Sequence, residues 1–181
     1  MKKLELSDVE VYELKSEIIN ETFEILVKQP DPAIVSLFGD KPLPVVYGTD
    51  ANLSAGSYVN TIDGLFLGGE IPPVIFIGIR YKLGDEPDFM QFVTNRTREF
   101  TPTEDVEKQK IMEQMTLREV KGGGAEDFLK FLTTELRDWV SERFNVSDDT
   151  TYIGDSMGGL FGLYTLFPVS YTHLTLPTNC V

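Results

Sequence analysis

Short apolar runs divide the first half of the chain into predicted strands. Residues 9–29 alternate between apolar and polar side chains, which is typical of half-buried strands, and the prolines in 28–32 end this pattern in a loop. The runs 44–48 and 72–79 are apolar almost throughout and contain several β-branched residues. Such runs predict strands that are buried on both faces, which is the usual setting of parallel strands.

The second half of the chain contains one strongly amphipathic segment, 125–144. Its charged residues fall on one side of a helix and its apolar residues on the other, namely Phe128, Leu132, Leu136, Trp139, Val140 and Phe144. Residues 52–67, which two glycines follow, predict a further helix. Strands that alternate with helices predict an α/β fold, with a mostly parallel sheet and flanking helices.

A long polar stretch separates these two halves. Residues 80–124 contain Pro87, Pro102 and three consecutive glycines. This composition predicts an insert without regular secondary structure, and inserts of this length are often functional. Beyond the amphipathic segment, 145–149 is predicted to be a turn and 150–153 a strand.

The strand 150–153 leads into a candidate catalytic turn. Gly154-x-Ser156-x-Gly158 matches the G-x-S-x-G elbow, and an apolar segment of helical character follows it. In such an elbow the serine lies exposed on a sharp bend, and side chains at the two glycines would collide with neighbouring segments. The Met157 amide would then lie at a helix N-terminus, aimed at a developing oxyanion. The alternative is an ordinary tight βα turn, which the position between strand and helix disfavours.

Charge and composition narrow the range of partners. The 16 Lys+Arg against 29 Asp+Glu give a formal net charge of -13, which opposes binding to phosphate backbones and anionic lipids. We therefore expect neither nucleic acid nor a membrane as a partner. No apolar run approaches the roughly 20 residues of a membrane helix and no secretory signal is visible, so a cytoplasmic protein is expected. The single cysteine, Cys180, excludes an internal disulfide, and no metal or cofactor is expected.

The segment around the elbow, 152–161, resembles that of the Putative esterase (esterase D-like) family of α/β-hydrolases. Three further segments, 45–52, 68–79 and 96–102, resemble the family in the same order along the chain. The resemblance covers about residues 10–168, and the branch to which the chain is most similar is that of siderophore (enterobactin-type) esterases. The wider family also contains acetyl and feruloyl esterases, S-formylglutathione hydrolases and acyltransferases.

The resemblance implies roles for several residues. Ser156 would be the nucleophile, and the backbone amides of Met157 and Ala51 would hold the oxyanion. Arg96 and Arg98 would lie near the substrate mouth, although a structural ion pair or the bracing of a loop is an equally open reading of both. No cofactor is implied.

The residues that would activate the serine are not found after it. In α/β-hydrolases an Asp or Glu and then a His follow the nucleophile. Here no Asp or Glu follows Ser156, and the sole histidine, His173, lies too close to it to be the expected base. Residues 169–181 carry no Lys, Arg, Asp or Glu and do not resemble the family. We expect residues 169–181 to be a non-native or artefactual tail, similar to a translated sequencing adapter, on a hydrolase domain, 1–168, that is incomplete at its C-terminus. The alternative is a natural tail that arose from a frameshift or a truncated gene. In either case we expect the chain itself to be inactive or nearly so. Asp155, where many relatives have histidine, is interpreted as variation.

Three functions stay open at this point. The favoured one is a serine ester hydrolase of the carboxylesterase type, which would act on a small-molecule ester through an acyl-enzyme on Ser156. A non-catalytic binding or scaffold domain would keep only the shape of the elbow, and an acyltransferase would pass the acyl group to an alcohol. The acyl group, the alcohol and the oligomeric state do not follow from the sequence, because fold does not fix function.

Overall fold

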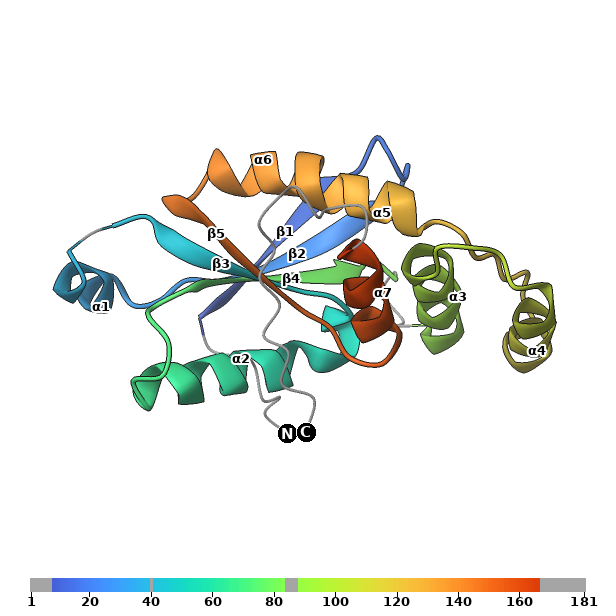
Figure 1. Cartoon of the computed structure of the whole chain (residues 1–181), viewed down its shortest axis with the longest axis horizontal. Helices are drawn as coiled ribbons and strands as arrows, with labels where there is room; N and C mark the ends of the chain where they lie inside the picture. The colour runs from blue at the N-terminus through green and yellow to red at the C-terminus, as the bar shows by residue number, and fades with distance from the viewer. Residues whose placement is uncertain (1–7, 40, 84–87, 167–181) are drawn as a thin grey trace.

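A five-stranded sheet with helices on both faces forms the centre of the computed structural model (Figure 1). The structure describes residues 8–39, 41–83 and 88–166. The predicted tail, 169–181, which includes His173, lies outside the described residues. The α/β architecture that the alternating strands and helices predict is confirmed.

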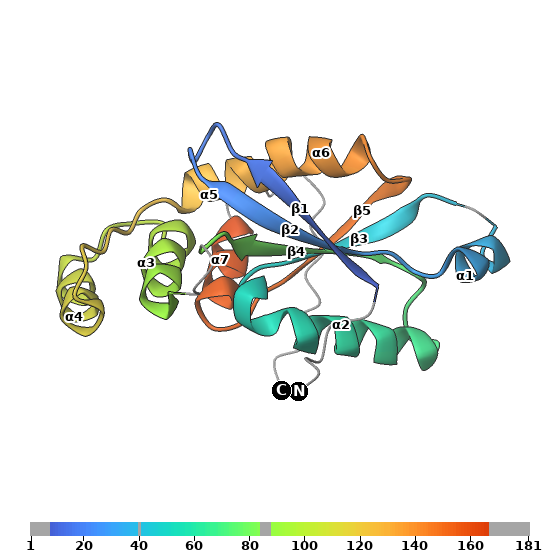
Figure 2. The ribbon, with the colours of Figure 1, turned by 180° about the vertical axis from the view of Figure 1, so that it is seen from behind.

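The strands lie side by side in the order β1-β2-β4-β3-β5. Their bounds are Val9–Lys15 for β1, Thr22–Lys28 for β2, Leu43–Gly48 for β3, Ile75–Tyr81 for β4 and Val146–Ile153 for β5. β2 pairs antiparallel with both β1 and β4, whereas β3 pairs in parallel with β4 and with β5. Seen from behind, β1 and β2 lie at the edge nearest the viewer (Figure 2). Because β3 and β5 are parallel neighbours, the turns that follow them lie together at the carboxyl ends of these strands.

Helices cover both faces of the sheet. α2 (Ala51–Leu67) lies on one face, and a helix made of α5 (Ala125–Phe131), the π-helical segment η1 (Leu132–Leu136) and α6 (Arg137–Ser141) lies on the other (Figure 1). The remaining helices are α1 (Pro32–Leu37), α3 (Phe89–Phe100), α4 (Val106–Thr116) and α7 (Met157–Thr165). The two helices predicted at 52–67 and 125–144 are thus confirmed, the second ending earlier than predicted. In the described part of the chain, no helix combines the length and the apolarity that crossing a bilayer needs.

The polar stretch 80–124 is not the irregular insert that its composition predicts, because it contains α3 and α4. Asp88 and Asp105 precede these helices, and each carboxylate accepts hydrogen bonds from backbone amides of the first turn. α3 also buries the rings of Phe92 and Phe100. N-caps of this kind stabilise a helix by about 1 kcal/mol, and an apolar face adds more. The polar composition concealed both signals.

The turn predicted at 145–149 is also wrong, since β5 already begins at Val146 opposite Leu43 of β3. A register irregularity separates this first pair from the rest of the ladder. In the described part of the chain β5 is an edge strand, and its residues Asp148 and Asp149 are exposed. Consecutive strand residues point to opposite faces of the sheet, so both faces are uncovered at these two residues and no apolar alternation marks the first half of β5.

The main core joins the sheet to α3, α5 and α7 through aromatic rings. The ring of Phe128 lies 5.4 Å from that of Phe100 and 5.1 Å from that of Phe161, measured between centroids. All three side chains are almost completely buried. Aromatic pairs at such distances stabilise a fold beyond the effect of their buried area. The cluster therefore fixes α3 and α7 against one another and against the sheet.

On the opposite face α2 approaches the sheet closely, because two strand residues lack side chains. A Cβ at Gly48 would lie 2.8 Å from the ring of Phe76, and one at Gly78 would lie 3.1 Å from the Cβ of Ala51. The first residue of α2 therefore lies directly against β4, beside the end of β3.

Candidate active site

Ser156 lies on a strained turn between β5 and α7. Its backbone has a φ of 54° and a ψ of -115°, which residues with a side chain rarely adopt, and the residue is exposed. Glycine is needed on both sides. A Cβ at Gly154 would lie 2.6 Å from the carbonyl carbon of Gly158, and one at Gly158 would lie 2.7 Å from the Thr49 hydroxyl oxygen. α7 begins at Met157, so the amide of that residue has no acceptor within the helix.

A buried tyrosine beneath the elbow joins it to the neighbouring strand. The Tyr152 hydroxyl donates a hydrogen bond of 2.7 Å to the Gly158 carbonyl and lies 2.8 Å from the Thr49 hydroxyl. A phenol has a single hydrogen to donate, so Thr49 is the donor in the second bond. Burial raises the pKa of Tyr152 well above its ordinary value, which keeps the hydroxyl protonated. The first turn of α7 and the end of β3 are thus held together.

The turn between β3 and α2 also places a residue with positive φ directly in front of a helix, although its ψ differs from that of Ser156. Asp50 has a φ of 56° and a ψ of 30°, and α2 begins at the buried Ala51. The side-chain amide of Asn52 donates to the Tyr81 carbonyl at 3.0 Å and accepts from the Tyr81 amide at 2.9 Å. The two predicted oxyanion donors, Ala51 and Met157, are therefore each the first residue of a helix that starts at the same edge of the sheet.

Arg96 of α3 contacts this second turn directly. Its guanidinium forms a bidentate ion pair with Asp50, in which Nε lies 3.0 Å from Oδ1 and Nη2 lies 2.6 Å from Oδ2. The side chains of Arg96 and Asp50 are only 17% and 4% exposed. The guanidinium also lies 5.5 Å and 5.7 Å from the ring centroids of Phe92 and Phe100, close enough for cation–π attraction. Burial raises the pKa of Asp50, and the hydrogen bonds from Arg96 oppose that rise.

Arg98 is on the same helix but has different partners. Its Nη2 lies 2.7 Å from Oε1 of Glu99 and 3.4 Å from Oε1 of Glu21. Glu99 is almost completely buried, and this burial raises the pKa of its carboxyl to about 7 although Arg98 lowers it. Of the two predicted arginines, Arg96 is the one that the structure places on the β3–α2 turn.

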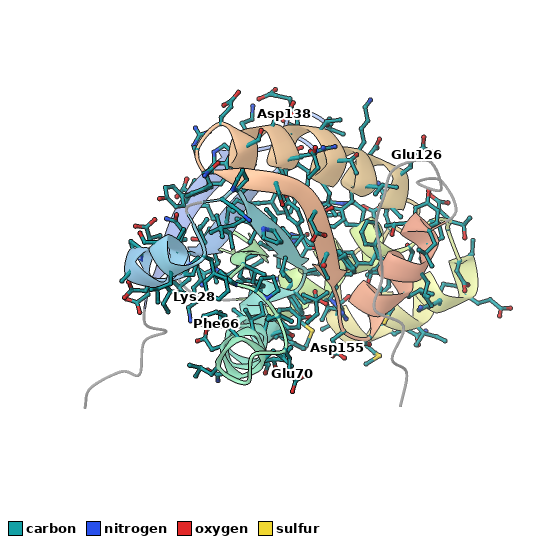
Figure 3. All side chains as sticks on the ribbon, turned by 60° about the vertical axis from the view of Figure 1, so that its left-hand side comes forward. Lys28, Phe66, Glu70, Glu126, Asp138 and Asp155 are labelled. Atoms are coloured by element: carbon teal, nitrogen blue, oxygen red, sulfur yellow. The ribbon has the colours of Figure 1, made fainter. Side chains whose placement is uncertain are left out.

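These contacts bring two helix N-termini together beside Ser156. A Cβ at Gly158 would lie 3.4 Å from Oδ2 of Asp50, so the β3–α2 turn touches the first turn of α7. Helix N-termini favour negative charge, because their first amides have no partner within the helix. Asp155, labelled in Figure 3 where β5 turns into α7, is exposed next to the serine. Among the described residues no group of three or more His, Cys, Asp or Glu side chains could hold a metal ion.

A cavity of about 650 Å³ lies elsewhere in the molecule. Its lining includes Lys28 and Phe66, both labelled in Figure 3, together with residues of β1, α1 and α2. No residue of the elbow or of the β3–α2 turn lines it. The candidate site is thus defined by backbone geometry and hydrogen bonds rather than by this cavity.

Comparison with protein families gives the same assignment as the resemblance noted above. Residues 16–171 match the family described as Putative esterase. The chain belongs to this family. The matched range contains the elbow, the β3–α2 turn and the helix that carries Arg96. No curated protein sequence matches the chain significantly.

Several solved structures share the fold. The BES protein of Bacillus cereus is 21% identical, with a TM-score of 0.73 over 97% of this chain and 62% of its own. An IroE-like serine hydrolase of Shewanella oneidensis is 24% identical, with a TM-score of 0.72 over 92% and 48%. The siderophore hydrolase EstB of Aspergillus nidulans is 23% identical, with a TM-score of 0.69 over 93% and 56%. The chain therefore spans roughly half to three fifths of the length of these structures.

Several residues that shape the site were not singled out from the sequence. Thr49, Asp50 and Asn52 each bond to a different neighbouring element, and Tyr152 lies beneath the elbow. Their positions could have drawn attention to them, because all four fall within the two segments 45–52 and 152–161 that resemble the family.

The close contact at Gly158 predicts opposite effects for two glycine substitutions. Gly158→Ala should lower the free energy of unfolding by about 1–3 kcal/mol, because the methyl group would press on the Thr49 hydroxyl. Gly64→Ala, at an exposed position in the last turn of α2 with open space around it, should raise the free energy by up to about 1 kcal/mol. Urea unfolding of both variants measures the difference. Equal effects would argue against the close contact at the elbow.

Burial of Glu99 predicts a dependence of stability on pH. Its carboxyl has a pKa of about 7 in the folded chain against an ordinary value of 4.5, so the folded state keeps a proton that the unfolded state loses. The stabilisation is complete below pH 4.5 and is lost as the pH rises through 7. From pH 5 to pH 8, Glu99→Gln should therefore gain roughly 2–3 kcal/mol relative to the wild type. Urea unfolding at both pH values checks this, with the exposed Glu142→Gln as a control that should show no such gain.

Proposed function

We propose that the protein to which this chain belongs is a serine ester hydrolase of the carboxylesterase type. Ser156 Oγ attacks the carbonyl carbon of a small-molecule ester, the alcohol leaves, and water releases the acid from the acyl-enzyme. The amides of Met157 and Ala51 bind the oxygen that becomes negative in the tetrahedral intermediate. The observation that carries this proposal is the exposed Ser156, which has a positive φ and lies at the start of α7, where the first turn of that helix contacts the β3–α2 turn.

The backbone conformation of Ser156 favours a catalytic elbow over an ordinary βα turn. A non-glycine residue in such a conformation costs on the order of 1–3 kcal/mol, and proteins keep that cost mainly where the side chain has a function. In an ordinary turn, glycine at position 156 would avoid this conformational cost. Position 156 is nevertheless a serine, and it lies between Gly154 and Gly158, which close packing requires to be glycine. The hydroxyl is thereby presented at the surface rather than hidden in the turn.

We further propose that the 181-residue chain is inactive or nearly inactive by itself. A serine hydroxyl is a weak nucleophile until a base takes its proton, and no Asp or Glu follows Ser156 in this sequence. β5 is an edge strand in the described part, and α7 leaves Leu160 and Leu163 about half exposed. Together with the partial coverage of related structures, these open surfaces support an active protein in which further chain covers them and supplies the base.

The substrate class follows from charge and from the related structures. One compared structure is described as a siderophore hydrolase, whose substrates are small molecules rather than polymers. The exposed Asp155 lies next to the nucleophile, and the chain carries a formal net charge of -13. Both oppose an anionic group close to the scissile bond. A neutral, small-molecule ester is therefore the substrate that the site favours.

The proposal predicts that activity depends on Ser156. In the complete gene product, obtained by reading the source DNA through the codon for Pro168, Ser156→Ala should lower kcat for p-nitrophenyl butyrate by about 10⁴-fold or more. The matched control is Ser141→Ala, because Ser141 is an exposed serine of α6 whose hydroxyl donates to the Asp138 carbonyl of the same helix. That control should keep its activity, and the 181-residue chain should show almost none.

Two results would overturn the proposal. Hydrolysis that survives Ser156→Ala would remove the serine from the mechanism. A complete gene product that binds esters without hydrolysing them would leave a binding domain that has kept only the shape of the elbow.

A further inference from the structure

One buried hydroxyl is bonded to both of the segments that carry the proposed oxyanion donors. The Tyr152 hydroxyl donates to the Gly158 carbonyl at 2.7 Å and accepts from the Thr49 hydroxyl at 2.8 Å. Gly158 directly follows Met157 in α7. Thr49 lies two residues before Ala51, the first residue of α2. Each of the two bonds thus attaches the phenol within two residues of one of the two amides.

Neither the sheet nor the helix requires these bonds for its own formation. The ends of β3 and β5 are already joined by their ladder, which the Thr49 amide extends by donating to the Ile153 carbonyl at 3.2 Å. The Gly158 carbonyl lies in the first turn of α7, where an α-helix supplies it with the amide four residues further on. What the phenol adds is a connection between the first turn of α7 and the end of β3.

The ring that carries this hydroxyl has little room to move. A Cβ at Gly162 of α7 would lie 2.8 Å from the ring of Tyr152, and one at Gly154 would lie 2.6 Å from its hydroxyl oxygen. The ring of Phe161 lies 5.8 Å away, measured between centroids. A side chain that packing fixes in this way can hold the groups to which it bonds at defined positions.

We propose that Tyr152 is a positioning residue whose hydroxyl sets the spacing between the Met157 and Ala51 amides that bind the oxyanion of the reacting ester. This inference rests on the function proposed above. Tyr152 acts through the Gly158 carbonyl and the Thr49 hydroxyl and touches no reacting atom. Two donors stabilise an oxyanion fully only when both lie about 2.7–3.1 Å from it, so a small change in their spacing lowers the rate.

The first test is Tyr152→Phe, which removes both bonds and keeps the ring. In the complete gene product, with p-nitrophenyl butyrate as the substrate, it should lower kcat by about 10-fold with KM nearly unchanged. The loss is smaller than the roughly 10²-fold cost of removing a whole oxyanion donor, because both amides are still present. The inhibition constant of phenylboronic acid should rise by a similar factor, because its adduct with the serine carries a negatively charged oxygen.

Two substitutions at Thr49 test whether the effect passes through the bond between the two side chains. Thr49→Ser keeps the hydroxyl and should retain most of kcat, whereas Thr49→Ala removes it and should lower kcat as Tyr152→Phe does. The double variant Tyr152→Phe/Thr49→Ala should be about as active as Tyr152→Phe, because the bond is already lost in the single variant. If Tyr152→Phe is too unstable to assay, the comparison of Thr49→Ser with Thr49→Ala tests the inference in its place.

The matched control is Tyr47→Phe. Tyr47 is also buried, and it lies opposite Tyr152 in the parallel pair of β3 and β5. The bonds to Thr49 and Gly158 are made by the Tyr152 hydroxyl and not by that of Tyr47. Tyr47→Phe should therefore leave kcat and the inhibition constant unchanged. Unfolding in urea gives the folded fraction of every variant, so that kcat is expressed per folded molecule.

The outcomes separate this inference from the proposed function. A fall in kcat that Tyr152→Phe and Thr49→Ala share, and that Tyr47→Phe lacks, supports the inference. An unchanged kcat in Tyr152→Phe, or an equal loss in Tyr47→Phe, overturns it while the proposed function stands. A Thr49→Ser variant as slow as Thr49→Ala overturns it in the same way. Activity that survives Ser156→Ala in the same assay overturns the proposed function, and this inference falls with it.

Discussion

The fixed position of the β3–α2 turn is the constraint on which the candidate site depends. Three residues of this turn and of the start of α2 bond to three different elements. Thr49 bonds to Tyr152 in β5, Asp50 to Arg96 in α3, and Asn52 to the backbone at the end of β4. Each bond alone contributes on the order of 1 kcal/mol, with more for the charged pair. Together they leave the first amide of α2 little freedom to move relative to the elbow.

Sheet topology places the elbow where this turn can reach it. β3 and β5 are parallel neighbours, so both strands end at the same edge and each leads through a residue with positive φ into a helix. Glycines at 48, 78 and 158 allow the close approaches that bring α2 and α7 to this edge. The aromatic cluster of α3, α5 and α7 then holds Arg96 and the elbow in one packed unit. Local strain at Ser156 is thus supported by packing on several sides.

Local chemistry made part of this arrangement predictable. The position of Ser156 could be predicted because the elbow is a five-residue motif in which steric crowding requires both glycines. The α/β fold could be predicted because the strands 44–48 and 72–79 are continuous apolar runs. The role of Asp50 could not, because its partner lies 46 residues away. The same holds for Thr49, whose partner is 103 residues distant. α3 and α4 were missed because their N-caps, and the buried rings of α3, are scattered through a polar stretch.

The most direct test of the account is the crystal structure of the complete gene product after reaction with a p-nitrophenyl phosphonate. The phosphorus should be bonded to Ser156 Oγ, with its charged oxygen about 2.7–3.1 Å from the amide nitrogens of both Met157 and Ala51. Phosphorus on another side chain, or a charged oxygen that is in contact with neither helix N-terminus, would contradict the assignment of this elbow and turn as the catalytic centre.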